Sequence, residues 1–127
     1  MKRVTGIGAI FFKAKDPDQL KEWYARHLGL PLKEDGDVSF HWRETDAPEQ
    51  QGRTVWAAFP KDTEYFKPSQ ATFMINYRVE DLDGLLAQLR KEGVKVDERV
   101  EDYEYGRFAW ATDPEGNRIE LWEPPRE

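Results

Sequence analysis

The sequence predicts an α+β fold built from two tandem β-α-β-β-β modules. A strand, a helix and three short strand-like runs occur twice in the same order, on either side of a polar linker that follows Pro60 and contains Pro68. An offset of 65 residues superposes Ile10 on Ile75 and Asp16 on Asp81. The 127 residues, 39% of them hydrophobic, fit one compact domain. We therefore expect one domain over residues 1–127, with module 1 at about 1–60, a linker at 61–70 and module 2 at about 71–127.

The first module begins with a strand at residues 4–14, which are rich in β-branched and aromatic side chains. Asp16 and Pro17 then form a helix start, and Gly29 is a helix stop. The apolar face of this helix predicts that Trp23 belongs to the core. Three strand-like runs follow at 30–33, 38–43 and 53–59. The apolar face consists of Leu20, Trp23, Tyr24, His27 and Leu28.

The second module repeats this order. Residues 71–79 form a strand pattern, Asp81 is the next helix cap, and Gly93 ends the helix. Leucines at helical spacing between them form one apolar face. Three further strands are expected at 95–101, 107–112 and 118–123.

Composition excludes several classes of function. The chain has no cysteine, so thiolate metal sites and thiol nucleophiles are absent, and its net charge of −6 disfavours nucleic acid as a partner. No apolar run is long enough to span a membrane, and no cleavable signal is apparent, so we expect no membrane partner and a cytoplasmic location. Ser39 and Ser69 lie outside any nucleophile motif, and Gly6-x-Gly8 lacks the third glycine of a dinucleotide fingerprint. No cofactor is expected.

The segment Asp113-Pro114-Glu115-Gly116-Asn117 is a well-defined turn that leads into the last strand. Arg118, Glu120 and Trp122 alternate on one face of that strand, which places a carboxylate between apolar neighbours. Together with the paired modules, the motif Asp-Pro-x-Gly-Asn-x-Ile-Glu-Leu resembles the vicinal oxygen chelate superfamily, which includes glyoxalase I, extradiol dioxygenases and bleomycin-resistance proteins. The resemblance covers essentially the whole chain. It implies a curved mixed sheet around a central cavity, with the helices outside.

Metal-binding members of that superfamily place ligands on the first and last strands of each module. The resemblance puts these points at Ala9, Trp56, Met74 and Glu120. Among these four, Glu120 alone carries a donor for a hard divalent cation, whereas a catalytic metal usually has about three protein ligands. We therefore expect no metal centre.

Strand alternation from these four points predicts the cavity wall. Glu120 is its polar anchor, and the predicted ligand-binding residues are Phe11, Trp56, Met74, Asn76 and Trp122. His41 lies in an alternating strand that reaches the cavity or its mouth, and it is a candidate general base beside Glu120. The alternative is that Trp56 and Met74 fill the space left by the metal. Glu120 would then form a salt bridge with Lys13, Arg78 or Arg118.

Two functions stay open at this point. The first is a metal-free protein of the glyoxalase and bleomycin-resistance type, which binds a small aromatic or cationic organic ligand. The second is a glyoxalase-like lyase or isomerase in which Glu120, with or without His41, transfers a proton. The resemblance and the exposed edges of two sheets also imply a homodimer.

Overall fold

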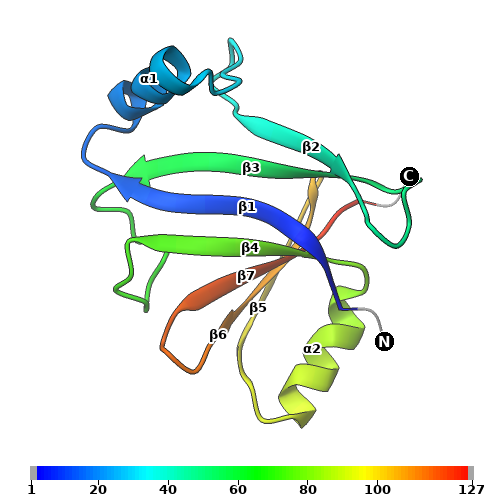
Figure 1. Cartoon of the computed structure of the whole chain (residues 1–127). Coiled ribbons are helices and arrows are strands. Elements are labelled where there is room, and N and C mark those ends of the chain that lie inside the picture. Colours follow the sequence, from blue (N-terminus) through cyan, green and yellow to red (C-terminus); the bar gives the residue numbers. More distant parts are fainter. Residues whose placement is uncertain (1–2, 126–127) are drawn as a thin grey trace.

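The computed structural model describes residues 3–125, so the predicted domain limits at residues 1 and 127 lie outside the described residues. Within this range the chain forms one mixed sheet and two helices (Figure 1). No helix among the described residues is long and apolar enough to cross a membrane. The elements in chain order are β1 Val4–Ala14, α1 Pro17–Leu28, β2 Ser39–Arg43, β3 Gln51–Pro60, β4 Phe73–Val79, α2 Leu82–Lys91, β5 Lys95–Tyr103, β6 Gly106–Thr112 and β7 Arg118–Glu123.

The sheet confirms the tandem plan. Its order is β2-β3-β1-β4-β7-β6-β5, so that β1 and β4 are central and each pairs in parallel with the last strand of its own module. The two modules meet through the antiparallel β1–β4 pair. The run at 30–33 is reduced to a single bridge between Leu32 and Val38. Pro31 has no N–H to donate to a strand ladder, which explains why this edge strand does not extend.

The two helices begin in the same way. The Asp16 carboxylate accepts a hydrogen bond from the N–H of Gln19 at 3.1 Å, and the Asp81 carboxylate accepts one from Gly84 at 3.1 Å. Gly29 ends α1 with a φ of 67°, a left-handed conformation that favours glycine. Equal caps at equal positions support duplication of one module.

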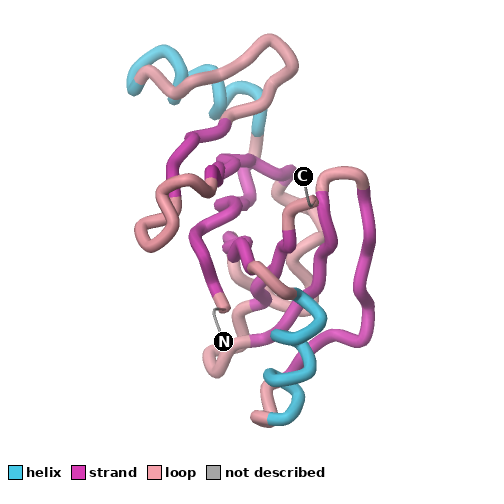
Figure 2. The backbone as a smooth tube through the Cα atoms, turned by 90° about the vertical axis from the view of Figure 1, so that its right-hand side faces the viewer, coloured by secondary structure: helices cyan, strands magenta, loops and turns pink. Residues whose placement is uncertain are grey.

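Both helices pack on the same face of the sheet, at opposite ends of the molecule (Figure 2). Helix α2 buries Leu82, Leu85 and Leu86 against β6 and β7. Helix α1 has no fully buried residue, and Trp23 is 51% exposed, so the expectation that Trp23 belongs to the core is wrong. The ring of Tyr24, 5.2 Å from that of Trp56, anchors α1 to β3.

The opposite, concave face of the sheet has its own apolar cluster. Phe66, Met74 and Trp110 are buried there, and the rings of Phe11, Phe59 and Phe108 pack around them. Phe66 comes from the linker between the modules, which therefore folds back over the sheet. This cluster closes one end of the concave face and leaves a pocket beside it.

Candidate functional site

A pocket of about 330 Å³ lies on the concave face. Strands from both modules build it, and the hairpin between β5 and β6 forms its outer wall. The lining side chains are mostly aromatic, with an amide and a carboxylate at the base. The pocket is lined by Gly8, Ala9, Phe11, Arg53, Val55, Phe59, Tyr65, Asn76, Glu101, Tyr103, Tyr105, Phe108, Glu120 and Trp122.

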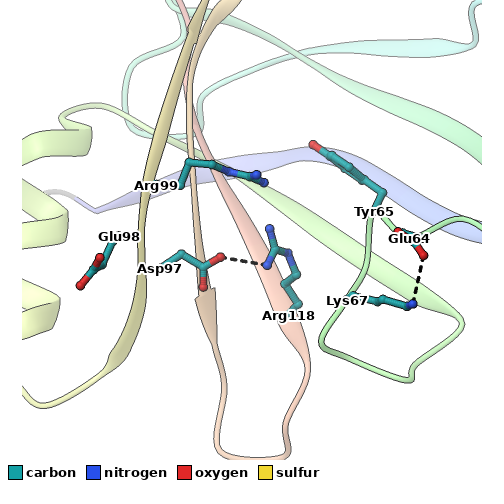
Figure 3. A pocket seen from close by; sticks show the side chains of 7 residues that line it. All are labelled: Glu64, Tyr65, Lys67, Asp97, Glu98, Arg99 and Arg118. Atoms are coloured by element: carbon teal, nitrogen blue, oxygen red, sulfur yellow. Dashed lines mark hydrogen bonds and ion pairs between the residues drawn. The ribbon is translucent and has the colours of Figure 1, made fainter.

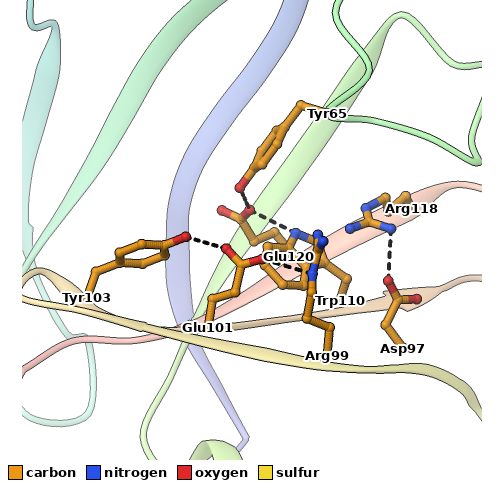
Figure 4. Close-up of polar contacts among 8 residues, drawn as sticks. All are labelled: Tyr65, Asp97, Arg99, Glu101, Tyr103, Trp110, Arg118 and Glu120. Carbon is orange, nitrogen blue, oxygen red and sulfur yellow. Dashed lines mark hydrogen bonds and ion pairs between the residues drawn. The ribbon is translucent and has the colours of Figure 1, made fainter.

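Glu120 is the polar centre of this pocket, and it is 1% exposed. The sheet register places it beside Asn76 on β4 and Trp110 on β6. Asn76 Nδ2 donates a hydrogen bond to Glu120 Oε1 at 2.6 Å, and Trp110 Nε1 donates one to Oε2 at 2.9 Å. The Tyr65 hydroxyl also donates to Oε2 (Figure 4). The carboxylate therefore has three donors from the protein itself.

Burial and hydrogen bonding shift the pKa of the Glu120 carboxyl in opposite directions. Burial raises the pKa of Glu120, and the three donors lower it by a smaller amount. The pKa of Tyr65 is also raised, because its hydroxyl is buried and lies against the Glu120 carboxylate. Asn76 Oδ1 is buried and has no hydrogen-bond partner within the described chain. The base of the pocket thus holds a carboxyl with a raised pKa and a free amide acceptor.

The expected alternative of a salt bridge to Glu120 is wrong, because the three candidate cations are engaged elsewhere. Lys13 lies over the Phe66 ring, and Arg78 forms an ion pair with Glu44. Arg118 bonds Asp97 at 2.9 Å and lies over the ring of Trp110.

A β-bulge in β1 decides which side chains reach the pocket. Ile7 pairs with Tyr77 and Ala9 pairs with Asn76, so Gly8 is an extra residue at this point of the ladder. A Cβ at Gly8 would collide with Asn76 Oδ1 and touch the Trp122 ring. Glycine at this position therefore lets Asn76 and Trp122 approach the backbone of β1 closely.

The expected position of Trp56 in the cavity wall is wrong. Ala9 pairs with Val55, so Val55 and not Trp56 shares its pocket-facing side. The Trp56 ring lies on the helix side of the sheet, 4.7 Å from the ring of Phe12 and 5.2 Å from that of Tyr24. A shift of one residue moves every side chain of a strand to the other face, and Trp56 is one residue beyond the position of β3 that pairs with Ala9.

The remaining predicted residues separate into three groups. Phe11, Asn76, Glu120 and Trp122 are brought together in the pocket. Met74 points to the concave side, but it is completely buried in the cluster with Phe66 and Trp110 and does not line the pocket. His41 lies outside, in an adjoining cavity with Arg53 and Trp122, and not beside Glu120.

Sequence reasoning missed Tyr65 and the aromatic hairpin. Tyr65 lies in the linker and stacks on Phe59 with 5.5 Å between ring centroids. It also borders a groove lined by charged side chains, including Lys67 and Arg118 (Figure 3). The sequence feature that could have identified Tyr65 is the Tyr65-Phe66 pair, because two large aromatic residues in a segment otherwise typical of a loop indicate that the segment packs against the domain. The hairpin contributes Tyr103, Tyr105 and Phe108.

The side chains at the metal-ligand positions of the superfamily do not fit a metal centre in this chain. Ala9 and Val55 carry no donor, and Met74 is a buried thioether. Both oxygens of Glu120 already accept hydrogen bonds. Residues 3–125 contain no group of three or more His, Asp or Glu side chains placed to hold a metal ion.

Comparisons with known proteins identify the family and the fold. Residues 6–121 match the family described as the Glyoxalase/Bleomycin resistance protein/Dioxygenase superfamily. Methylmalonyl-CoA epimerase from Mycobacterium tuberculosis is 25% identical with a TM-score of 0.60, over 97% of this chain and 90% of that one. No curated protein matches the chain.

Two other solved structures show how widely the fold is used. A variant of Streptomyces coelicolor methylmalonyl-CoA epimerase in complex with 2-nitronate-propionyl-CoA is 19% identical with a TM-score of 0.70, over 97% of this chain and 99% of that one. A Legionella pneumophila structure named as an NAD-dependent benzaldehyde dehydrogenase is 15% identical with a TM-score of 0.59, over 92% of this chain and 98% of that one. These similarities establish the fold, and their names differ in activity.

Proposed function

The chain belongs to the glyoxalase/bleomycin resistance protein/dioxygenase superfamily, and from this premise we propose that it is a metal-free protein that binds a small planar organic ligand in the concave pocket. The observation that carries the proposal is a pocket of about 330 Å³ with aromatic walls and two buried polar groups at its base. Flat rings stack well on such walls, and a few polar groups orient them.

Glu120 and Asn76 are the proposed anchors for the ligand. Asn76 Oδ1 has no donor within the described chain, and Glu120 Oε2 accepts from Tyr65, a residue on the linker between the modules. A ligand N–H or O–H group would satisfy the amide oxygen or replace the Tyr65 hydroxyl. A cation is the less favoured ligand, because the carboxylate already has three donors.

Binding is favoured over catalysis because Glu120 lacks a suitable partner for proton transfer. The raised pKa of Tyr65 makes its hydroxyl a poor acid near neutral pH. His41 lines the adjoining cavity and does not line the pocket that contains Glu120.

A lyase or isomerase that uses Glu120 as acid or base is the second candidate. The raised pKa of this carboxyl favours it, because perturbed carboxyls in pockets are suited to proton transfer near neutral pH. The similarity to methylmalonyl-CoA epimerases points to the same class of reaction. Deuterium exchange at an acidic carbon of a bound ligand, lost in Glu120→Gln, would support this candidate over simple binding.

The test of binding uses the neutral probe 2-naphthalenemethanol, titrated while tryptophan emission is recorded. Trp122→Leu should weaken the affinity about two- to tenfold, the range expected for a lost stacking partner. Trp56→Leu is the matched control, because Trp56 lies on the helix side of the sheet. Equal losses in both variants, or no binding by the unsubstituted protein, would contradict the proposal.

The homodimer is also part of the proposal. Ile7, Ile10 and Phe73 are 37%, 41% and 43% exposed, and the register of β1 and β4 puts them on the helix side of the sheet. A second copy of the chain would cover this apolar strip. Light scattering should give twice the chain mass at micromolar concentration, and Ile10→Glu should give the mass of one chain. A single-chain mass for both proteins would contradict the dimer.

We also propose a single domain and a cytoplasmic location. Residues 1–127 are proposed to form one domain, so limited proteolysis should not release a stable module. A cytoplasmic location is proposed from the sequence, and cell fractionation tests it.

A further inference from the structure

A second cavity of about 430 Å³ adjoins the mouth of the pocket. The two share Arg53, Tyr105 and Trp122, so they form one continuous site. The charged and titratable side chains that line this cavity include two arginines and a histidine, and none of its lining residues in the described chain is Asp or Glu. The lining residues are His41, Gln51, Gly52, Arg53, Arg78, Tyr105, Trp122, Pro124 and Pro125. This basic mouth stands out in a chain whose net charge is −6.

Arg53 is the central cation of the mouth. It lies on β3 and is exposed, and its guanidinium group forms no ion pair or hydrogen bond with any described residue. Most of the other arginines of the described chain, in contrast, bond a carboxylate or a carbonyl oxygen, as Arg78 does with Glu44 and Arg118 with Asp97. His41 is the direct cross-strand partner of Arg53, so both side chains leave the sheet on the same face.

The two carboxylates of the inner pocket, Glu101 and Glu120, make their contacts with other residues and not with Arg53 or His41. Glu120 accepts from Tyr65, Asn76 and Trp110. Glu101 accepts from the Tyr103 hydroxyl and forms an ion pair with Arg99 at 2.8 Å.

We infer that the ligand is an organic anion whose planar ring lies in the concave pocket and whose oxyanion group, a carboxylate or a phosphate, lies at the mouth against Arg53 and His41. This inference rests on the proposed function and adds the charge and orientation of the ligand. The rings of Tyr105, Phe108 and Trp122 lie between the concave pocket and the mouth. The ring centroids of Tyr105 and Phe108 are 5.6 Å apart, and those of Phe108 and Trp122 are 6.4 Å apart. Arginine binds such oxyanions through paired N–H donors.

The experiment compares naphthalene probes that differ in charge, by calorimetric titration of the full chain. The probes are anionic 2-naphthoate and 2-naphthyl phosphate, neutral 2-naphthalenemethanol and cationic 2-naphthylmethylammonium. At least one anion should bind roughly two- to fivefold more tightly than the neutral probe, as expected for one partly exposed ion pair. The cation should bind more weakly than the neutral probe. High salt should reduce the preference for the anion.

Arg53→Gln should bring the ratio of anion to neutral affinity to about one. Arg26→Gln is the matched control, since Arg26 is an exposed arginine on α1 and does not line either cavity. The ratio should be unchanged in that variant. A preference for carboxylate over phosphate, or the reverse, identifies the oxyanion.

The outcomes separate this inference from the function on which it rests. If the neutral probe binds but neither anion binds more tightly, the inference is overturned and the proposed function stands. If the preference persists in Arg53→Gln, the anion is held elsewhere and the inference is also overturned. If none of the probes binds, the proposed function fails and the inference fails with it.

Discussion

Replacement of Glu120 by leucine should be strongly destabilising, whereas replacement by glutamine should not. A leucine side chain at this position would leave three donors without an acceptor. Two of them belong to Trp110 and Asn76, which are 1% and 2% exposed, while Tyr65 is 36% exposed and can turn to water. Each buried donor without a partner costs about 1–3 kcal/mol, so the free energy of unfolding should fall by about 2–6 kcal/mol.

Glutamine has the shape of glutamate and keeps one oxygen for Trp110 and Tyr65. Its amide nitrogen would face Asn76, and rotation of the Asn76 amide would turn Oδ1, which now lacks a partner, toward that nitrogen. We therefore expect Glu120→Gln to lie within about 1 kcal/mol of the unsubstituted protein. Urea unfolding at pH 7 measures both variants, and Glu98→Leu, at an exposed position of β5, is the control for the change of residue type.

The difference in stability between the unsubstituted protein and Glu120→Gln should depend on pH. Burial raises the pKa of Glu120 in the folded state above its ordinary value of 4.5, so folding favours the protonated form. The stability that this group contributes is fully present below the ordinary pKa and is lost as the pH rises through the raised pKa. The unsubstituted protein should therefore lose stability relative to Glu120→Gln as the pH rises from the ordinary pKa of 4.5 toward neutrality. A constant difference over this range, or equal destabilisation by the glutamine and leucine substitutions, would refute the reasoning.

Three further predictions concern the bulge, the metal and α1. Gly8→Ala should lower the free energy of unfolding by about 1–3 kcal/mol in urea unfolding, because its Cβ collides with Asn76; an unchanged midpoint would contradict the bulge. Zn²⁺, Ni²⁺ or Mn²⁺ should not raise the melting temperature of the untagged protein, and a stoichiometric shift abolished by Glu120→Gln would reject the metal-free account. Trp23→Ala should cost clearly less than the roughly 3–5 kcal/mol of a buried tryptophan, because Trp23 is 51% exposed.

Local signals predicted much of the fold and part of the site. Asp16 and Asp81 mark the helix starts because a capping carboxylate acts on N–H groups only three residues away. The last strand, Arg118–Glu123, has the predicted bounds, and Glu120 and Trp122 lie on its pocket side as alternation requires. These features depend on residues that are close in the sequence, so the sequence alone is sufficient to predict them.

The errors arose where distant segments meet. The face of Trp56 depends on the register between β1 and β3, which are joined by a helix and several loops, and a single residue of offset reversed it. The bulge in β1 lies at Gly8, where a side chain of the other module, Asn76, approaches the backbone closely. Tyr65 reaches Glu120 across 55 positions of sequence, and no local pattern predicts such a contact.

The position of 2-naphthoate in a co-crystal tests the central claim most directly, because that claim is that the concave face binds a planar organic ligand. We expect electron density for the ring between Phe11, Phe108 and Trp122, above Glu120, with the carboxylate toward Arg53. Density for the ring on the helix side of the sheet, near Trp56, or in the charged groove beside Lys67, would contradict the claim.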